Sequence, residues 1–132
     1  MDAAISYGTY PIRLGHVVAI IVIAQCGSGA RADEIANGRT AFAVCSACHS
    51  TDGSKRMGPS LNGLIGRKAG SASDFNFSPA MRRSTIVWDA EALDKFLANP
   101  QYEIPGNRMP FSGIADGSKR ADIAAYLATL KQ

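Results

Sequence analysis

Five consecutive residues, Cys45-Ser-Ala-Cys48-His49, constrain what this chain can fold into more than any other part of its sequence. Two thiols three positions apart are followed at once by an imidazole, and the chain has no cysteine or histidine after His49. A C-x-x-C-H run is typical of c-type haem attachment, because each thiol can add to one haem vinyl group and the histidine can bind the iron. The run predicts one haem c, held covalently through Cys45 and Cys48, with His49 as an axial ligand.

Rival uses of this run fail on the supply of ligands or on their setting. A structural zinc site needs four N, S or O ligands, usually Cys or His, and a cysteine-ligated iron–sulfur cluster needs more thiols than these two. A thioredoxin-like redox pair needs a βαβ setting, which the sequence does not show. A disulfide across two intervening residues would be strained and would leave His49 without a role.

Three helical patterns and scarce strand signals predict an all-α domain. The first pattern runs from about residue 34 to residue 47. The second begins at Asp89, a natural N-cap, and stops at Asn99-Pro100, where proline forbids continuation. The third begins near Ser118 and places apolar residues on one helical face, namely Ile123, Tyr126, Leu127 and Leu130.

Long loops rich in glycine and proline join these helices, mainly over residues 63–73 and 104–110. Short helical turns are expected after Ser60 and at Ser78-Pro79, where serine caps a helix that begins with proline. The run at 85–88 is strand-like but has no partner. Three short helices bury little apolar area in a domain of roughly 100 residues. Ordered loops of this length indicate that something else fills the interior, and a haem would do so.

The N-terminal residues have the pattern of a secretory signal. Arg13 precedes a wholly apolar run over 17–24, and Ala30-Arg-Ala32 follows with the small-x-small pattern that signal peptidase recognises. The apolar run is too short to cross a bilayer, since a spanning helix needs about 20 such residues. We expect residues 1–32 to be a cleaved signal peptide and residues 33–132 to be the mature domain, exported to the periplasm.

Two alternatives to cleavage are an uncleaved, loosely inserted anchor and a lipoprotein modified at Cys26. The bulky polar Gln25 just before that cysteine argues against the lipoprotein. The formal net charge of the whole chain is +3. That excess is too small and too scattered to predict a nucleic-acid partner.

The expected mature chain, residues 33–132, contains no second histidine to fill the sixth position of a haem iron, so a permanent ligand there would be methionine. Downstream of the expected cleavage site the candidates are Met57, Met81 and Met109. Met109 lies in a polar loop between Pro105 and Pro110, which restrict the backbone and can hold a thioether without a helix. Met57 and Met81 fit core packing better, where methionine is a common filler. The sequence therefore favours Met109.

Six landmarks cover nearly the whole of the expected mature chain: Cys45-Ser-Ala-Cys-His49, Gly58-Pro-Ser-Leu61, Gly63-Leu-Ile-Gly-Arg67-Lys68, Trp88, Asn99-Pro100 and Ile104-Pro-Gly-Asn-Arg-Met109. In these landmarks the chain resembles the class I cytochrome c family, close to the mitochondrial type and its small bacterial relatives, from Gly38 to Lys131. The resemblance implies the cytochrome c fold. In that all-α fold three main helices, short helical turns and long loops pack around one covalently bound haem.

The resemblance also implies roles for individual residues. His49 and Met109 would be the axial ligands, and the carbonyl of Pro59 would accept the other ring N–H of His49. Phe111 would pack beside the exposed haem edge. Three side chains would donate hydrogen bonds to the haem propionates: Arg67, Trp88 and Asn107. Where the first and last helices cross, four residues would meet: Gly38, Phe42, Tyr126 and Leu127.

The chain departs from the family pattern in the haem pocket and on the docking face. Phe77 and Phe96 stand where tyrosines are common, and Met81 replaces a polar residue, so we expect a drier pocket. The family's ring of lysines around the haem edge maps onto five positions of which one is basic: Val44, Gln101, Arg108, Ala115 and Asp116. Because charge steers encounter more than it sets affinity, electron transfer to a partner should depend weakly on ionic strength.

These features predict a soluble monohaem c-type cytochrome that carries one electron at a time between membrane or periplasmic redox complexes, without enzymatic activity. Its partners would be a quinol-oxidising complex, a terminal oxidase, a reaction centre or a peroxidase. We expect the protein to be a monomer and to contact these partners only transiently. Histidine and methionine ligation favours Fe(II) and closes the iron to substrates. The alternative is a haem enzyme or gas sensor, for instance peroxidase-like, with a labile sixth ligand.

Overall fold

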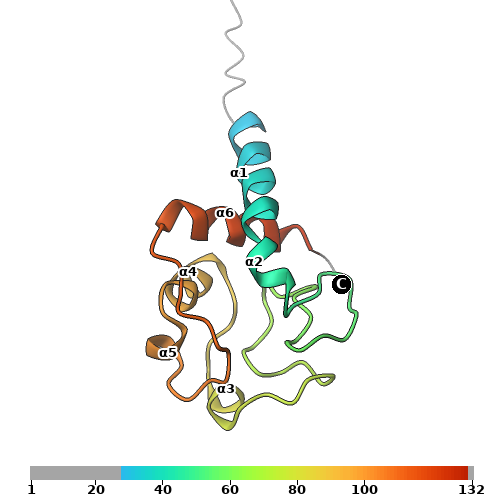
Figure 1. Ribbon diagram of the computed structural model, residues 1–132, viewed down its shortest axis with the longest axis vertical. Coiled ribbons are helices and arrows are strands. Elements are labelled where there is room, and N and C mark those ends of the chain that lie inside the picture. Colours follow the sequence, from blue (N-terminus) through green and yellow to red (C-terminus); the bar gives the residue numbers. More distant parts are fainter. Residues whose placement is uncertain (1–27, 131–132) are drawn as a thin grey trace, which may run out of the picture.

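Helices supply nearly all of the regular structure in the computed structural model, which describes residues 28–130 (Figure 1). In chain order they are α1 (Ser28–Ala41), α2 (Ala43–Ser46), α3 (Pro79–Arg83), α4 (Ala90–Ala98), α5 (Pro100–Glu103) and α6 (Gly117–Ala128). These residues form no extended strand, only an isolated antiparallel bridge between Lys68 and Val87. The predicted all-α class is confirmed, but the segment 85–88 has a pairing partner that the sequence does not predict.

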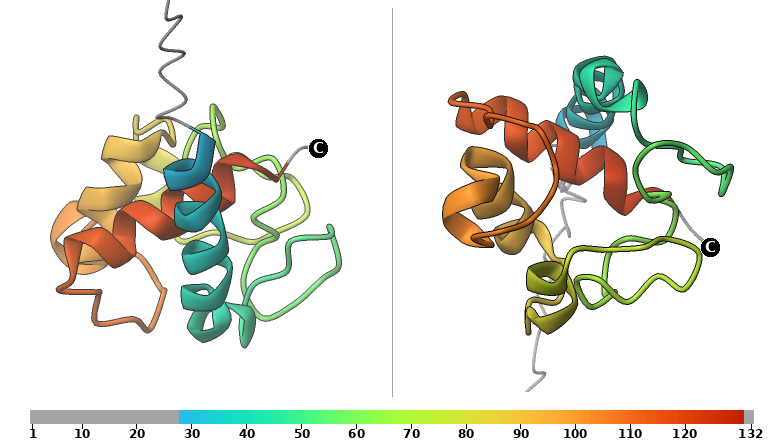
Figure 2. Two further views of the ribbon diagram at one scale, coloured as in Figure 1. Left: turned by 90° about the horizontal axis from the view of Figure 1, so that it is seen from above. Right: turned by 60° about the horizontal axis from the view of Figure 1, so that its bottom comes forward.

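The helices α1 and α6 cross at a close contact (Figures 1 and 2). A β-carbon built on Gly38 would lie 1.9 Å from the carbonyl oxygen of Asp122, so the contact requires glycine. About one helical turn after Gly38, the ring of Phe42 packs against that of Tyr126, with the ring centroids 5.5 Å apart. Most of the apolar stripe expected on α6 is buried, namely Ile123, Tyr126 and Leu127, whereas Leu130 follows the helix and is half-buried.

The caps of α4 and α5 determine where both helices begin. The carboxylate of Asp89 accepts a hydrogen bond from the N–H of Ala92 at 2.8 Å, which satisfies a free donor in the first turn of α4. The side chain of Asn99 accepts from the N–H of Tyr102 at 3.1 Å and caps α5. Pro100 is therefore the first residue of a short helix and not of a loop. The start and the end of α4 were predicted, but α5 was not. The buried face of α4 is formed by Leu93, Phe96 and Leu97.

Arg120 ties an irregular segment to two helices. From α6 its guanidinium donates to both carboxylate oxygens of Asp94 on α4, at 2.7 and 3.5 Å. It also donates to the backbone carbonyls of Ile114 and Ala115, at 2.8 and 2.9 Å. This one side chain therefore fixes the end of the loop that connects α5 to α6.

Two predicted local structures differ from the observed ones. The first helix begins before residue 34 and is interrupted at Phe42, after which α2 runs to Ser46. Ser60 is followed by turns, because its hydroxyl accepts from the N–H of Asn62 at 3.3 Å and closes a tighter turn than a helix. The prediction at Ser78 is confirmed, since that residue caps α3.

The expected signal segment lies mostly outside the described residues, including its apolar run over 17–24. The expected cleavage point after Ala32 falls inside α1. Within residues 28–130 no helix combines the length and the apolar character that membrane crossing requires.

Gly38→Ala is expected to lower the free energy of unfolding by roughly 2–3 kcal/mol, because the added methyl group would force α1 and α6 apart. Denaturant unfolding of the haem-loaded protein measures this. Gly117→Ala is the matched control, since the neighbour nearest to its new β-carbon is the flexible end of Arg120 at 3.4 Å. We expect the control to change stability by less than about 0.5 kcal/mol. Equal effects of the two substitutions would contradict the close crossing.

Candidate haem site

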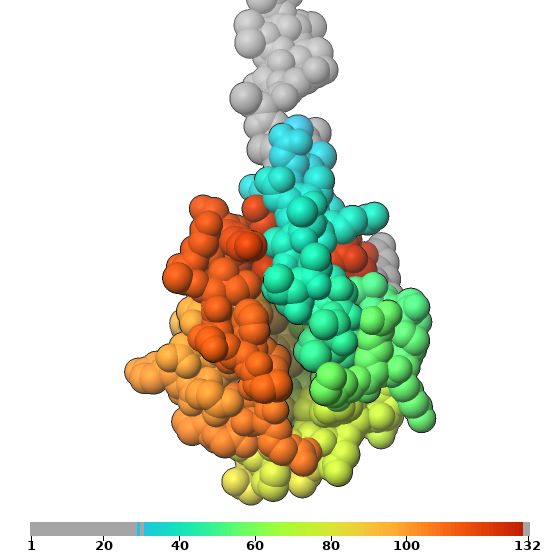
Figure 3. All heavy atoms as spheres, in the orientation of Figure 1, coloured from blue at the N-terminus to red at the C-terminus, as the bar shows by residue number. Residues whose placement is uncertain are grey.

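A cavity of about 580 Å³ opens between two stretches of chain that are far apart in the sequence. One wall comes from α2 and the loop after it, and the other from the loop 104–113. Figure 3 shows the surface hollowed between these segments, teal and green on one side and orange on the other. The volume lies within the range of about 300–1,000 Å³ that is typical of cofactor pockets. Helices α4 and α6 add an apolar lining of Leu93, Phe96, Leu97, Ile123 and Leu127.

The turn from Cys45 to His49 brings two thiols and an imidazole to this cavity. The backbone N–H groups of Cys48 and His49 both donate to the carbonyl of Cys45, at 3.1 and 2.9 Å, and this tightens the chain after α2. All three side chains line the cavity, and neither Cys45 nor Cys48 forms a disulfide. Burial raises the pKa of the Cys45 thiol above its usual range, and the nearby Cys48 raises it further.

Backbone groups of the same wall fix the ring of His49. Its Nδ1 lies 2.8 Å from the carbonyl oxygen of Pro59. Because a carbonyl can only accept, Nδ1 carries the proton, and Nε2 keeps a lone pair for a metal ion. Pro59 therefore lies where the resemblance implied. Gly58 is a further requirement, because a β-carbon there would lie 2.6 Å from Cε1 of His49. The sequence gives no sign of this contact, since glycine before proline is locally an ordinary turn.

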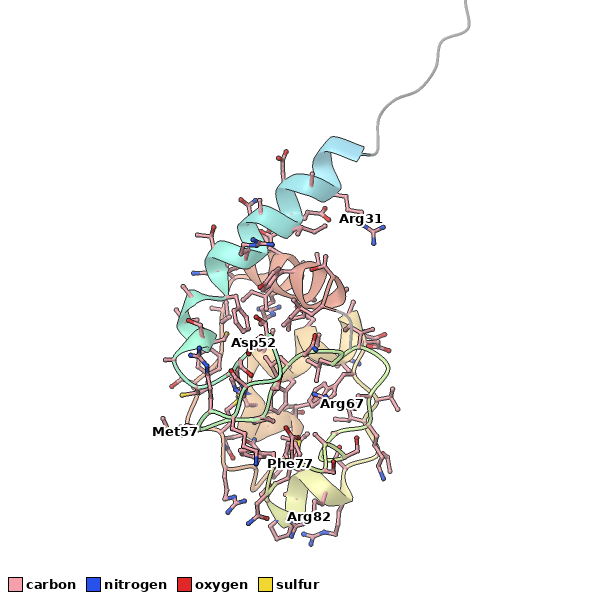
Figure 4. The ribbon with its side chains drawn as sticks, turned by 90° about the vertical axis from the view of Figure 1, so that its right-hand side faces the viewer. Arg31, Asp52, Met57, Arg67, Phe77 and Arg82 are labelled. Carbon is pink, nitrogen blue, oxygen red and sulfur yellow. The ribbon has the colours of Figure 1, made fainter. Side chains whose placement is uncertain are left out.

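Three methionines approach the cavity, and their positions distinguish them. Met57 lies on the wall that carries His49 and is 76% exposed; Figure 4 shows it at the outer edge of the molecule. Met81 in α3 and Met109 in the loop 104–113 are half-buried and line the cavity. Met109 belongs to the loop that forms the other wall, whereas Met81 belongs to α3.

Arg67 and Trp88 place N–H donors in the lining, whose polar members also include Lys68, Ser71, Asn76, Ser78 and Arg108. Arg67 lies between the loops in Figure 4 and donates to the carbonyls of Asn62 and Ser60, at 3.2 and 2.9 Å. Burial lowers the pKa of its guanidinium, and Asp74 partly opposes that effect. A partly desolvated cation with further N–H groups suits an anionic oxygen ligand. Trp88 is 6% exposed, and its indole nitrogen can only donate.

The side chain of Asn107 donates within its own turn, and the propionate contact that the resemblance implied stays a prediction. Its amide nitrogen has two hydrogens, and it donates to the carbonyls of Pro100 at 2.7 Å and Ile104 at 2.9 Å. The side chain is buried and does not line the cavity. It folds back onto its own turn because Gly106, with φ at +84°, reverses the chain just before it.

The three apolar residues that predict a dry pocket all line the cavity. Phe96 packs edge-on against Trp88, with ring centroids 5.0 Å apart, and Phe77 packs in the same way against Phe75 at 4.8 Å. Neither these rings nor the thioether of Met81 offers an N–H or O–H group. Water in a buried site needs two or more polar partners, so these positions give it little support.

Arg108 makes a long-range contact at the edge of the cavity. Its guanidinium donates to the carbonyl of Asn76, 32 residues earlier in the chain, and Arg82 donates to the neighbouring carbonyl of Phe77. The loop that carries Met109 is thereby joined to the loop before α3. The sequence places Arg108 only on the docking face, because a contact over this separation leaves no periodic signal.

The residues around the cavity fit a haem attached at Cys45 and Cys48. They supply two thiols at the required spacing, an imidazole whose Nδ1 is already engaged, and a thioether on the opposite wall. No cluster of three or more His, Cys, Asp or Glu side chains that could hold a metal ion occurs in the part of the chain that the structure describes.

Comparison with known proteins agrees with this chemistry. The family model described as cytochrome c matches residues 35–131. The chain belongs to the cytochrome c family. It is 45% identical over 91 residues to cytochrome c2 iso-2 of Magnetospirillum fulvum, a match that covers 68% of this chain and 95% of that protein. It is 38% identical over 120 residues to cytochrome c2 of Rhodomicrobium vannielii, covering 89% of this chain and 94% of that one.

The cytochrome also resembles a solved structure, cytochrome cH from Methylobacterium extorquens, with a TM-score of 0.69 and 44% identity. That match covers 72% of this chain and 97% of the solved one, so the fold is the cytochrome c fold. The cofactor is one haem c, attached covalently through Cys45 and Cys48. The protein is a one-electron carrier. The cytochrome c fold, the haem c cofactor and the one-electron carrier function predicted from the sequence are therefore confirmed.

Phe96→Tyr is expected to lower the reduction potential of the cytochrome by roughly 30–60 mV, where 59 mV is a tenfold change for one electron. The reason is that a hydroxyl in the apolar lining stabilises the more charged oxidised iron. Potentiometric titration followed by visible absorption measures the change. Tyr102→Phe is the control, because it also changes one aromatic hydroxyl but at a position that is 81% exposed. It should leave the reduction potential unchanged. An unchanged potential in Phe96→Tyr would contradict the dry-pocket hypothesis.

Proposed function

We propose that this cytochrome passes single electrons between redox proteins outside the cytoplasmic membrane, with His49 and Met109 as the axial ligands of its haem iron. The arrangement of the two cavity walls carries this proposal. His49 lies on one wall with its Nδ1 held by Pro59, and Met109 lies on the other. When bound, haem c supplies an iron that alternates between Fe(II) and Fe(III).

The ligand residues set the preference for one oxidation state. The hydrogen bond from His49 to Pro59 orients the imidazole and presents Nε2 to the cavity. The soft thioether of Met109 and the apolar lining both favour the less charged Fe(II), which raises the reduction potential. Two strong ligands from two fixed walls also keep the geometry similar in both states, so little rearrangement accompanies electron transfer.

Arg67 and Trp88 are the proposed hydrogen-bond donors to the haem propionates. Both side chains line the cavity, and both are drawn from the segment between the Cys45–His49 turn and α4. The guanidinium of Arg67 also holds the carbonyls of Ser60 and Asn62, which fixes its position before any ligand binds. Charge-assisted hydrogen bonds of this kind offset the cost of partly burying a carboxylate.

We infer that the protein is not an enzyme. With His49 and Met109 both bound to the haem iron, no coordination site would be open to a substrate. A peroxidase-like reaction also needs a distal acid or base, and the chain has no histidine after His49 for that task. A haem enzyme or gas sensor would need an open iron, which a single ligand-binding measurement can detect.

The mouth of the cavity is the proposed contact surface for redox partners. Val44 and Met57 line it and are 59% and 76% exposed. Of the five positions that match the family's lysine ring only Arg108 is basic, and its guanidinium is engaged with Asn76. The proposed partners are a quinol-oxidising complex, a terminal oxidase, a reaction centre or a peroxidase. The protein would act as a monomer and would bind each partner transiently through the apolar mouth of the cavity.

We also propose that residues 1–32 direct export and are removed, so that the working protein begins at Asp33 in the periplasm. The support is the sequence pattern of Arg13, the apolar run 17–24 and Ala30-Arg-Ala32. Covalent haem attachment through two thioethers needs reduced thiols in the exported chain. The mass of the purified protein decides the question, because it reports the cleavage site and the attached haem together.

The reduced wild-type protein is expected to bind no carbon monoxide, because Met109 occupies the sixth position. Met109→Ala is expected to bind it readily, with the absorption change of an open Fe(II) haem. Met57→Ala is the matched control, since Met57 is 76% exposed on the other wall and its loss should open nothing. Binding of carbon monoxide to the wild type would favour the enzyme or sensor instead.

The rate of electron transfer to a redox partner is expected to change less than about threefold between low and high salt, because few charges steer the encounter. Stopped-flow measurement at several ionic strengths tests this. The substitution Val44→Lys should steepen the salt dependence by adding one charge at the mouth of the cavity. Asn37→Lys, on the exposed side of α1, adds one such charge elsewhere and should not. A steep fall in the wild-type rate would count against the apolar docking surface.

A further inference from the structure

The side chain of Asn107 joins the backbone of Met109 to the most buried part of the neighbouring turn. Its amide oxygen accepts the N–H of Met109 at 2.9 Å. Its amide nitrogen donates to the carbonyls of Pro100 and Ile104, at 2.7 and 2.9 Å. Pro100 is less than 2% exposed and Ile104 is 4% exposed. One side chain thus connects the loop at the cavity to an anchor in the core.

The backbone of Asn107 is held as firmly as its side chain. Its N–H donates to the carbonyl of Ile104 at 3.1 Å, and its carbonyl accepts from the side-chain amide of Gln101 at 3.1 Å. On the far side of Met109, the N–H of Phe111 donates to the Met109 carbonyl at 2.9 Å. The N–H and C=O of Met109 are therefore both engaged, although the residue belongs to no helix.

We infer that Asn107 is the positioning residue for the Met109 thioether, and that it acts by fixing the Met109 backbone and not by touching the haem. The inference rests on the proposed assignment of Met109 as the sixth ligand. An asparagine oxygen that accepts an N–H two residues on forms an Asx turn, which gives the loop a defined shape where no helix supplies one. Both amide hydrogens are used inside that turn.

This anchor has its largest effect in the oxidised state. The soft thioether sulfur binds Fe(III) less well than Fe(II). In the oxidised protein, binding of the Met109 thioether to the iron therefore depends more on the position of the loop than it does in the reduced protein. A looser loop shows itself as easier replacement of the thioether by an added ligand, while the reduced protein changes less.

Titration of oxidised protein with imidazole tests the inference, because imidazole competes with the thioether for the sixth position. We expect Asn107→Ala to raise the imidazole affinity about tenfold, the size of effect that follows from losing buried hydrogen bonds. Asn107→Ser keeps a shorter acceptor for the Met109 N–H and should give an intermediate rise. The readouts are the thioether-to-Fe(III) absorption band and the rate of hydrogen exchange at the Met109 amide, which should increase in the same order.

Asp89→Ala is the matched control. Asp89 also accepts one backbone N–H through its side chain, that of Ala92, and it makes no hydrogen bond to the turn that holds Asn107 and Met109. Its loss should weaken α4 and leave the imidazole affinity within about twofold of the wild type. Equal effects of Asp89→Ala and Asn107→Ala would overturn the inference, because the response would then be one of general stability.

Two further results would also overturn it, and they are distinguishable. If Asn107→Ala leaves the imidazole affinity unchanged but alters the pH dependence of the reduction potential, Asn107 acts on a propionate instead. If Met109→Ala keeps the thioether band of the wild type, Met109 is not the ligand, and the proposed function's ligand assignment fails together with this inference. Should Asn107→Ala not fold, the comparison between Asn107→Ser and the wild type carries the test.

Discussion

The covalent link from Cys45 and Cys48 to the haem is the interaction on which the rest of this structure depends. Among residues 28–130, seven of the twelve buried apolar residues lie on α4 and α6. The segment from 47 to 78 adds only a few buried residues, namely Ser50, Leu64, Ala69 and Ser78. That segment has few apolar partners of its own and forms a wall of the cavity. A large apolar cofactor tethered beside it supplies the contact area that its sequence lacks.

Polar side chains replace helical hydrogen bonding in the irregular parts of the chain. Buried backbone carbonyls need donors, and in this cytochrome Arg67, Arg108 and Arg120 each donate to at least one loop carbonyl. Asn107 does the same within a single turn. These contacts hold the loops around the cavity in defined positions without lengthening any helix. The cavity keeps its shape because its walls are fixed from behind.

Features set by neighbouring residues could be predicted from the sequence, and features set by distant ones could not. Asp89 and Ser78 were recognised as caps because a cap is a local pattern of polar residue and helix start. The C-x-x-C-H run fixed the cofactor for the same reason. The contact between Arg108 and Asn76 spans 32 residues and leaves no local signal. Only the folded turn showed where the Asn107 amide hydrogens go, because Gly106 redirects the chain there.

The attachment groups and the opposite wall belong to separate parts of the chain, and this division has a consequence for how the protein can vary. Both thiols and the imidazole lie within one short turn, so retention of the pigment depends on that turn alone. Substitutions in the loop 104–113 would therefore leave the prosthetic group attached. Divergent descendants of this protein are free to adjust their electron affinity on one side of the porphyrin while inheriting the other side unchanged.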